Sequence, residues 1–508
     1  MTNYWDWLRL VEGTNSLLFL ENVFVLKKIV VTLLVTKQIK AFSRMKKILL
    51  ALATTLTTLL AWGQAEVVIT RDTANTVDML VLDITTVDSV MPTCELVDHP
   101  VGAFGNGITN AEKIPGRLVV TLLGDTLYNS GDYQKGESGM TVRVSGNSSA
   151  WKNPKPYKIK LQQKADLLFR DNDIYIDKDW RLLRDDRNLN TVAGLMINEL
   201  MGMQWTPQYK YCNVFINGTY QGLYLLIENV KRNTDCRLNV SKKGYIVERD
   251  AYWWNEDLYF KTYYFTDNRY GYTFKYPESD EVTEEQINYI KQYLIDAEKS
   301  IKQGTYDEYI DIESFASWLL AHDILGTWDS GGSNLYVTKY DNTPDTKLIM
   351  GNLWDFDSSR QMTGSFSRYH SGADYYFENL FNSPNPVFSN IYISKWAHVK
   401  PLLGSVMTTM LDGFSAENAT AINASRHFVC DTYGNTFVSV ASNLVTQKNW
   451  FKTKLAWLEK NIGSPIVTPV SDLHTEPAAT GKTYNLQGIE VPATTPGLVI
   501  RNGKLIKQ

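Results

Sequence analysis

Two acidic loops in the second half of the chain carry the residue types that phosphoryl transfer requires. The first loop reads TWDSGGSN over residues 327–334, and the second, WDFD, ends at Asp357. Asp329 and Asn334 have the D-x-x-x-x-N spacing, in which an aspartate lies near the attacking hydroxyl and a turn brings the asparagine toward a metal ion. Asp355 would add the hard oxygen ligand that Mg²⁺ prefers. The pattern predicts a phosphoryl-transfer site with Asp329 as a catalytic residue and metal ligands at Asn334, Asp355 and Asp357.

A strand upstream of these loops supplies positive charge for nucleotide phosphates. The sequence YKIKL over residues 157–161 places Lys158 and Lys160 on one face, because side chains alternate along a strand. A lysine on a strand meets the phosphate charge in protein kinases. We predict Lys160 in this role, for binding and for catalysis, with Lys158 beside it. The loop SGNSS at residues 145–149 could lay backbone N–H groups over phosphates, because glycine permits close approach.

The elements that would position these residues are predicted from local patterns. Asn217-Gly218 between two apolar runs predicts a hairpin over residues 211–230, because a type I′ turn needs positive φ at both central residues. A second hairpin is predicted between the two acidic loops, and the chain past Ser365 is predicted to be mostly helical. Apolar residues at helical spacing predict helices at residues 185–202, 283–303 and 312–325. The mixture indicates an α+β protein.

The whole chain has the composition of a folded protein without a strong global charge. Its 508 residues are 44% hydrophobic, and 51 Lys and Arg balance 55 Asp and Glu, which leaves a net charge of −4. This balance argues against nucleic acid as a partner, so phosphate binding would need a local site. The six histidines and four cysteines show no zinc-ligand spacing in the sequence.

The N-terminal part of the sequence has the pattern that predicts an export signal. MKK at Met45 is followed by a charge-free apolar run, Ile48 to Trp62, and by small residues that fit a cleavage site. The run is short for a membrane span, so we expect no transmembrane segment in the mature chain. The alternative is a buried N-terminal helix. Export would place the protein in the periplasm, on the cell surface or outside the cell.

Six blocks of the sequence together resemble a known family. They read RVSGNSSAWKNPKPYKIKL, DWRLLRDDRNLNTVAGLMINELMG, VFINGTYQGLYLLIENV, GYIVERD, TWDSGGSN and LWDFD. In this order they are similar to the successive blocks of the CotH (spore coat protein H) kinase family. The resemblance implies an atypical protein-kinase-like fold of two lobes, with a β-rich N-terminal lobe and a mostly helical C-terminal lobe. It also implies binding of ATP and Mg²⁺ or Mn²⁺, and phosphorylation of Ser or Thr on a protein acceptor that the sequence does not name.

The resemblance also implies roles for single residues. By position, Lys160 is similar to the phosphate-contacting lysine, Glu228 lies where the chain passes the adenine pocket, and Glu199 is a candidate partner for the lysine. The family usually reads RGNSS where this chain has Ser145 in place of the arginine. Arg143 points the same way on the strand and could substitute, or the nucleotide site could be weakened, because serine offers no bidentate fork to phosphate.

Ordinary structural roles compete with these functional ones. Asp329 and Asn334 could simply be turn-forming residues beside two glycines, and Lys158 could be a solvated strand lysine. Glu228 could pair with a buried lysine for structural reasons, and Glu199 could be a solvent-facing helix residue. The competing function is a non-catalytic surface or envelope protein in which the same fold serves adhesion or assembly. We predict this division of the chain: an upstream segment at 1–44, a signal peptide at 45–65, a β-rich lead-in at 66–115, the kinase-like domain at 116–462, a linker at 463–481 and a β tail at 482–508.

Overall fold

The structure, a computed structural model, describes most of the chain after the predicted signal peptide. It describes residues 68–508 except 104–106, 109–111, 263–268, 328–329, 357–374, 463–482, 486–489, 493, 495–496, 502–503 and 508. The described residues from Ile69 onward belong to one unit, Ile69–Gln508. The upstream segment, the signal peptide and the linker that the sequence predicts lie outside the described residues.

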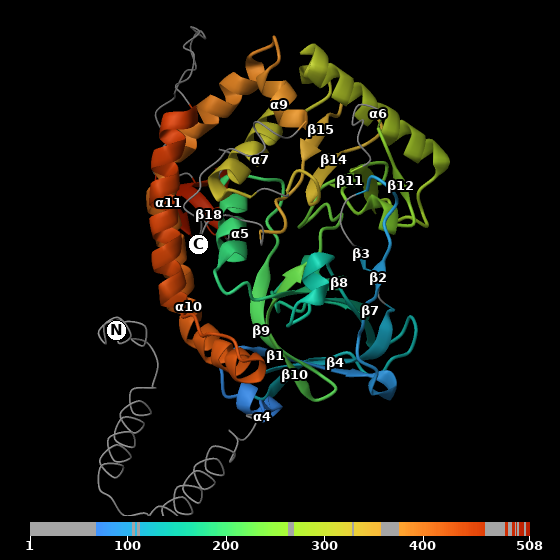
Figure 1. Cartoon of the computed structure of the whole chain (residues 1–508), viewed down its shortest axis with the longest axis vertical. Coiled ribbons are helices and arrows are strands. Elements are labelled where there is room, and N and C mark those ends of the chain that lie inside the picture. Colours follow the sequence, from blue (N-terminus) through green and yellow to red (C-terminus); the bar gives the residue numbers. More distant parts are fainter. Residues whose placement is uncertain are drawn as a thin grey trace, which may run out of the picture. The chain divides into compact units, whose positions relative to one another are not determined.

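Seven strands close into a β-barrel in the N-terminal half (Figure 1). Neighbouring strands are antiparallel except β1 and β9, which are parallel, and β1 also pairs with β4 and so closes the ring. The strands around the barrel are β1 (Leu80–Thr86), β9 (Tyr209–Ile216), β10 (Thr219–Glu228), β8 (Asp177–Arg184), β7 (Tyr157–Ala165), β6 (Met140–Val144) and β4 (Ile114–Leu122). An eighth strand, β5 (Asp125–Asn129), pairs with β4.

Alternation along the strands gives the barrel an apolar interior, while its outer face is charged along β6 and β7 and apolar along β9 and β10. Ile159, Trp180 and Leu226 belong to a hydrophobic cluster inside the barrel. In β6 and β7 the residues between the buried ones, among them Arg143 and Lys158, are only partly buried and face outward. The predicted hairpin is confirmed as β9 and β10, which are joined by Asn217-Gly218 with φ values of 51° and 77°.

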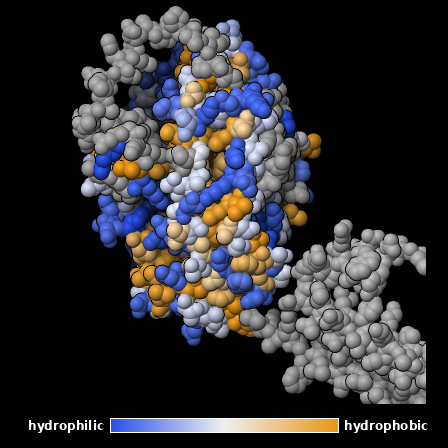
Figure 2. All heavy atoms as spheres, turned by 90° about the vertical axis from the view of Figure 1, so that its left-hand side faces the viewer, coloured by the Kyte–Doolittle hydropathy of each residue, from blue (hydrophilic) through white to orange (hydrophobic). Residues whose placement is uncertain are grey.

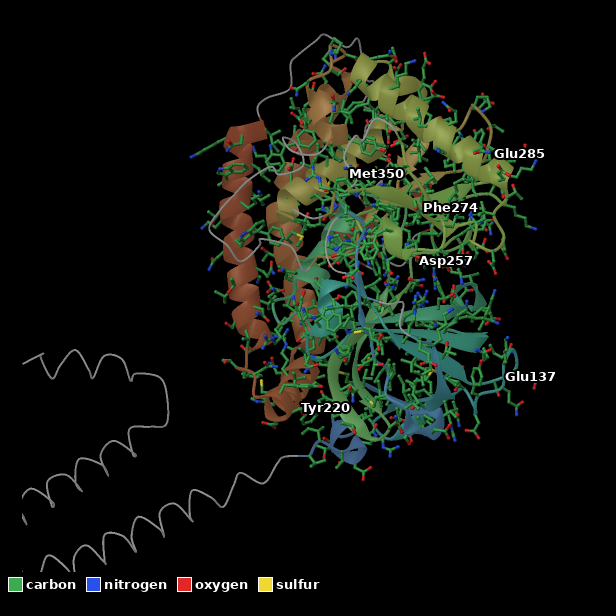
Figure 3. All side chains as sticks on the ribbon, turned by 45° about the vertical axis from the view of Figure 1, so that its right-hand side comes forward. Glu137, Tyr220, Asp257, Phe274, Glu285 and Met350 are labelled. Carbon is green, nitrogen blue, oxygen red and sulfur yellow. The ribbon has the colours of Figure 1, made fainter. Side chains whose placement is uncertain are left out.

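A second, five-stranded sheet carries the loops that the sequence singled out. Its order is β12 (Tyr259–Phe260), β13 (Gly271–Tyr276), β11 (Tyr245–Asp250), β14 (Leu335–Lys339) and β15 (Leu348–Met350). The predicted hairpin between the acidic loops is confirmed as β14 and β15. Figure 1 shows this sheet above the barrel, and in Figure 3 Met350 and Phe274 mark the sheet while Tyr220 and Glu137 mark the barrel.

Helices surround the second sheet and one of them reaches the barrel. They are α5 (Asn190–Leu200), α6 (Glu284–Gln303), α7 (Ile312–Leu325), α9 (Tyr375–Phe381), α10 (Val387–Tyr433) and α11 (Val440–Ile462). The predicted start of α6 is confirmed by a capping box at Thr283 and Gln286. Helix α10 packs against α7, α11 and β10, so it spans both sheets (Figure 1). On the side that α10 and α11 cover, hydrophilic and hydrophobic residues are interspersed (Figure 2).

Helix α5 begins later than the sequence predicts. The predicted helix started at residue 185, but the first helical residue is Asn190. The carboxylate of Asp186 accepts hydrogen bonds from the backbone N–H groups of Leu189 and Thr191, and Leu189 has a φ of 63°. The DDRN segment therefore forms the N-terminal cap rather than the first turn.

The lead-in and the tail both contain strands, as predicted. Strand β1 comes from the lead-in but is part of the barrel, so a boundary at residue 116 cuts through one closed sheet. The remaining short elements are α4 (Arg71–Ala74), β2 (Leu96–Val97) and β3 (Gly107–Ile108). The tail forms a four-stranded sheet of β16 (Thr483–Tyr484), β17 (Glu490–Val491), β18 (Leu498–Arg501) and β19 (Lys504–Lys507). None of the helices in the described residues is long and apolar enough to span a membrane.

Candidate functional site

Three cationic side chains lie side by side on the outer face of the barrel. The strand register pairs Arg143 of β6 with Lys158 of β7, and Lys158 with Arg181 of β8. We call these three residues the basic row. Burial, followed by the charge of Arg181, lowers the pKa of Lys158 to about 8. The same two causes lower the pKa of Arg143. The basic row is a concentration of like charge that an anion would relieve.

Asp179 is the acid beside the basic row. Its carboxylate lies 2.7 Å from the Lys231 ammonium and 3.7 Å from the Lys158 ammonium. Burial opposes ionisation of Asp179, but these two lysines outweigh it and lower its pKa to about 2. Lys160 is opposite Asp179 in the strand register but is exposed, whereas Lys158 is largely enclosed. The structure therefore makes Lys158 the stronger candidate for the phosphate lysine.

Arg181 connects the basic row to the loop after β15. Its guanidinium carbon lies 5.7 Å from the centre of the Trp354 ring, next to Asp355 in the chain. Its Nη1 also donates a hydrogen bond of 3.3 Å to the hydroxyl of Ser145. Ser145 is the position where the sequence departs from the family pattern. In this chain the Arg181 guanidinium of β8 contacts its hydroxyl.

The loop of Asp355 is fixed by helix α5. Asn198 of α5 accepts a hydrogen bond of 2.7 Å from the backbone N–H of Leu353. The Phe356 ring packs directly on Gly194, where a larger side chain would overlap the ring. These contacts hold the backbone on both sides of Asp355, which has a φ of 55°. A non-glycine residue in this region is strained, and such strain is concentrated at functional sites.

Asn334 is held in a similar backbone conformation at the start of β14. Its φ is 66°, and its backbone N–H donates a hydrogen bond of 2.9 Å to Glu248 of β11. The surrounding charges shift the pKa of Tyr336, which is two residues further along the chain. Burial and the carboxylate of Glu248 raise its pKa well above the usual value, Asp355 acts in the same direction, and Arg181 opposes them.

Two of the predicted metal ligands belong to the same end of the second sheet. Asn334 directly precedes β14 and Asp355 follows β15, and these two strands are antiparallel neighbours that pair Val337 with Met350. The charges of Glu248, Arg181 and Asp355 all act on the pKa of Tyr336. Sequence reasoning missed Arg181, Glu248 and Asp250 as parts of the site. The signals were present, because Arg181 occupies an outward position in DWRLLR and the two acids alternate in GYIVERD.

Two predicted residues are placed away from the basic row. Glu228 is fully buried, forms ion pairs with Arg170 at 2.9 Å and Arg237 at 3.6 Å, and accepts the backbone N–H of Gln208. The carboxylate of Glu228 therefore forms structural ion pairs, which was the alternative role for this residue. Its partners are two arginines instead of the lysine that this alternative expected. Its adenine-pocket role stays a prediction.

Glu199 does not pair with the phosphate lysine. Its carboxylate accepts a hydrogen bond of 3.0 Å from the backbone N–H of Leu498, in the C-terminal tail. The acid that pairs with Lys158 is Asp179 instead. The hydrogen bond of Glu199 to Leu498 shows that this end of α5 faces the tail sheet.

Two residues of the predicted site lie outside the described residues. They are Asp329, the predicted catalytic residue, and Asp357, the third predicted metal ligand. Within the described residues, no three His, Cys, Asp or Glu side chains form a group that could hold a metal ion. Asn334 and Asp355 offer an amide and a carboxylate oxygen, which suit Mg²⁺ or Mn²⁺ rather than zinc. They therefore fit the predicted cation as part of a larger set.

Comparison with known families identifies the chain. A comparison with curated proteins gave no match. The family described as CotH kinase protein matches residues 142–424, more than half of the chain. The match begins in β6, one residue before Arg143, and includes the whole basic row, both acidic loops and most of α10. The chain therefore belongs to the CotH kinase protein family.

Proposed function

We propose that this chain is an atypical protein kinase that transfers the γ-phosphoryl group of ATP to a serine or threonine of a protein acceptor. The observation that carries the proposal is the contact of Arg181, in the basic row, with the ring of Trp354, which precedes Asp355, at the end of the second sheet where Asn334 leads into β14. Cations on one side and oxygen ligands on the other are what a metal-bound triphosphate requires.

Each part of this arrangement has a role in the proposed reaction. Lys158, Arg143 and Arg181 would bind the phosphates, with the exposed Lys160 as a further cation at the edge. Asn334 and Asp355, together with Asp357, would hold Mg²⁺ or Mn²⁺, which neutralises charge on the phosphate oxygens. Asp329 would accept the proton of the acceptor hydroxyl. The acceptor hydroxyl oxygen then forms a bond to the γ-phosphorus. At the same time the bond between the γ-phosphorus and the β–γ bridging oxygen breaks, and ADP leaves.

The proposal assigns the barrel and the second sheet to the two lobes of a kinase-like fold. The interior of the barrel has its own hydrophobic cluster, and a second cluster joins the second sheet, the helices and the outer face of β9 and β10. In this arrangement the basic row belongs to the N-terminal lobe, and the loops of Asn334 and Asp355 belong to the C-terminal lobe. Nucleotide would bind between them.

A transfer assay with the Asp329→Ala variant tests the proposal. The wild-type protein, incubated with labelled ATP and Mn²⁺ or Mg²⁺ and a mixed protein acceptor, should incorporate phosphate, and the variant should not. Circular dichroism checks that the variant is folded. Transfer at the wild-type rate by the folded variant would reject Asp329 as the catalytic residue.

The competing function is a non-catalytic surface or envelope protein. The observation that favours it is Ser145, which replaces the arginine expected in the phosphate loop. The position of Arg181 weighs against it, because its guanidinium contacts Ser145 and keeps an arginine at this loop. A folded wild-type protein that binds no ATP in the presence of Mg²⁺ would favour the structural role.

We also propose that the protein is exported. The support is the sequence of residues 45–65 alone. Expression of the full chain in a bacterial host, followed by N-terminal sequencing of the exported protein, should find a mature chain that starts at Gln64 or Glu66. An uncleaved chain retained in the cytoplasm would contradict this proposal.

A further inference from the structure

Two acids on β11 hold the turn that leads into Asn334. Glu248 and Asp250 are two residues apart and so share one face of the strand. One oxygen of Glu248 accepts the backbone N–H of Asn334 at 2.9 Å. One oxygen of Asp250 accepts the hydroxyl of Ser333 at 3.0 Å, and the Ser333 hydroxyl in turn accepts the backbone N–H of Ala251 at 3.2 Å.

Both acids are themselves fixed and shielded from water. Glu248 and Asp250 are 6% and 7% exposed. The second oxygen of Glu248 pairs with the Lys275 ammonium of β13 at 2.8 Å. Asp250 also accepts the backbone N–H of Tyr252 at 2.8 Å. Hydrogen bonds to buried, oriented carboxylates are stronger than neutral ones and are costly to lose.

An aromatic ring confines the same turn from another side. Gly332 lies against the ring of Tyr270, and a larger side chain at this position would overlap the ring. The guanidinium carbon of Arg249, between the two acids in sequence, lies 4.4 Å from the centre of that ring. The turn is thus held by a backbone hydrogen bond, a hydroxyl hydrogen bond and a packing contact, all from residues of the second sheet or its loops.

We infer that Glu248 and Asp250 are positioning residues of the phosphotransfer site, which fix the Ser333–Asn334 turn so that Asn334 can bind the metal ion of the metal–ATP complex. This inference rests on the proposed function. Without the hydrogen bond to Glu248, fewer contacts would hold the Asn334 backbone in its strained conformation, which has a φ of 66°.

A purely structural role for the two acids makes a different prediction. If Glu248 and Asp250 only stabilise the sheet, their variants lower the melting temperature and leave the metal dependence of the folded enzyme unchanged. If they position Asn334, the Mn²⁺ concentration at half-maximal activity rises by about 10- to 100-fold, as for residues that orient metal ligands. The dependence on the acceptor protein changes little in that case.

The experiment compares variants of the full chain in an ATP- and Mn²⁺-dependent transfer assay, with direct Mn²⁺ binding by electron paramagnetic resonance in the presence of a non-hydrolysable ATP analogue. Glu248→Ala removes the acceptor of the Asn334 N–H. Glu248→Gln keeps an acceptor oxygen and should rescue much of the Mn²⁺ affinity. Ser333→Ala removes the hydroxyl bond to Asp250 without altering either acid. Glu137→Gln, on the exposed loop marked in Figure 3, is the matched control.

The outcomes separate the two proposals. If the wild-type protein binds no Mn²⁺ with the nucleotide, the proposed function fails and this inference falls with it. If the wild type binds but Glu248→Ala and Ser333→Ala, both folded, keep its Mn²⁺ affinity, only the inference is overturned. Should Glu248→Ala fail to fold, Ser333→Ala decides: a loss of Mn²⁺ affinity supports the inference, and unchanged affinity rejects it.

Discussion

Replacement of Asp179 by asparagine tests the electrostatic reasoning about the basic row. Asp179 lies between Lys231 at 2.7 Å and Lys158 at 3.7 Å, and its side chain is 8% exposed. Its pKa falls from 3.8 to about 2 on folding. Since one pKa unit corresponds to about 1.4 kcal/mol, the ionised carboxylate stabilises the folded protein by about 2 kcal/mol at neutral pH. Asp179→Asn should lower the free energy of unfolding by about this amount.

The pH dependence of that loss follows from the direction of the shift. A carboxyl group whose pKa is depressed in the folded state contributes stability above its unfolded pKa, and this contribution disappears as the pH falls through the folded value. Urea denaturation of the wild type and of Asp179→Asn at pH 7, 5, 4 and 3 measures this dependence. The difference in their free energy of unfolding should be largest at pH 7 and should begin to decrease below about pH 4.

The control for this measurement is Asp125→Asn, because Asp125 is an exposed residue of β5 in the same barrel. Its effect on unfolding should stay within about 0.5 kcal/mol. The reasoning would be refuted if Asp179→Asn were as stable as the wild type at pH 7. A difference that stayed constant down to pH 3 would also contradict it, because a lost packing contact does not titrate.

Two further predictions concern the packing and the buried acids of the second half of the chain. Gly194→Ala should destabilise the protein by about 1–3 kcal/mol despite the higher helix propensity of alanine, because the added methyl group overlaps the Phe356 ring; a stability equal to or above that of the wild type in urea denaturation would contradict the packing. Burial raises the pKa of Glu298 to about 7, so its contribution to stability is present below its unfolded pKa and is lost as the pH rises through about 7. The melting temperature of Glu298→Gln, relative to the wild type, should accordingly rise between pH 5 and pH 8, and a constant difference would show that Glu298 does not titrate there.

Local signals in the sequence predicted many of the secondary elements. Asn217-Gly218 specifies its hairpin because both residues take positive φ, and Thr283 specifies the start of α6 by capping. These signals act within a few residues, so they need no knowledge of the rest of the fold. The family blocks were predictable for the same reason, because each is a contiguous stretch.

The closure of the barrel could not be predicted in this way. Strand β1 pairs with β4 and, in parallel, with β9, which is more than 100 residues away. Nothing local in the sequence of β1 specifies that partner. The boundary predicted at residue 116 followed from treating the lead-in as separate.

The partners of single charged residues could not be predicted from the sequence either. The sequence places Lys158 and Lys160 on one face of a strand, and the prediction chose Lys160. In the structure Lys160 is exposed, whereas the side chain of Lys158 is 23% exposed and pairs with Asp179. Glu199 was assigned to the lysine, but its partner is a backbone N–H in the tail. Such pairings depend on which elements meet in space, and this is fixed by packing rather than by spacing along the chain.

The central claim is that the basic row binds the phosphates of ATP against the loops of Asn334 and Asp355. Isothermal titration calorimetry of the purified protein with ATP and Mg²⁺ tests it most directly, with Lys158→Met as the perturbation and Lys164→Met, an exposed lysine of the same strand, as the control. The account predicts Mg²⁺-dependent binding that weakens by about 10- to 100-fold in Lys158→Met and is unchanged in Lys164→Met. Absence of binding to the folded wild type, or equal affinity in Lys158→Met, would contradict it.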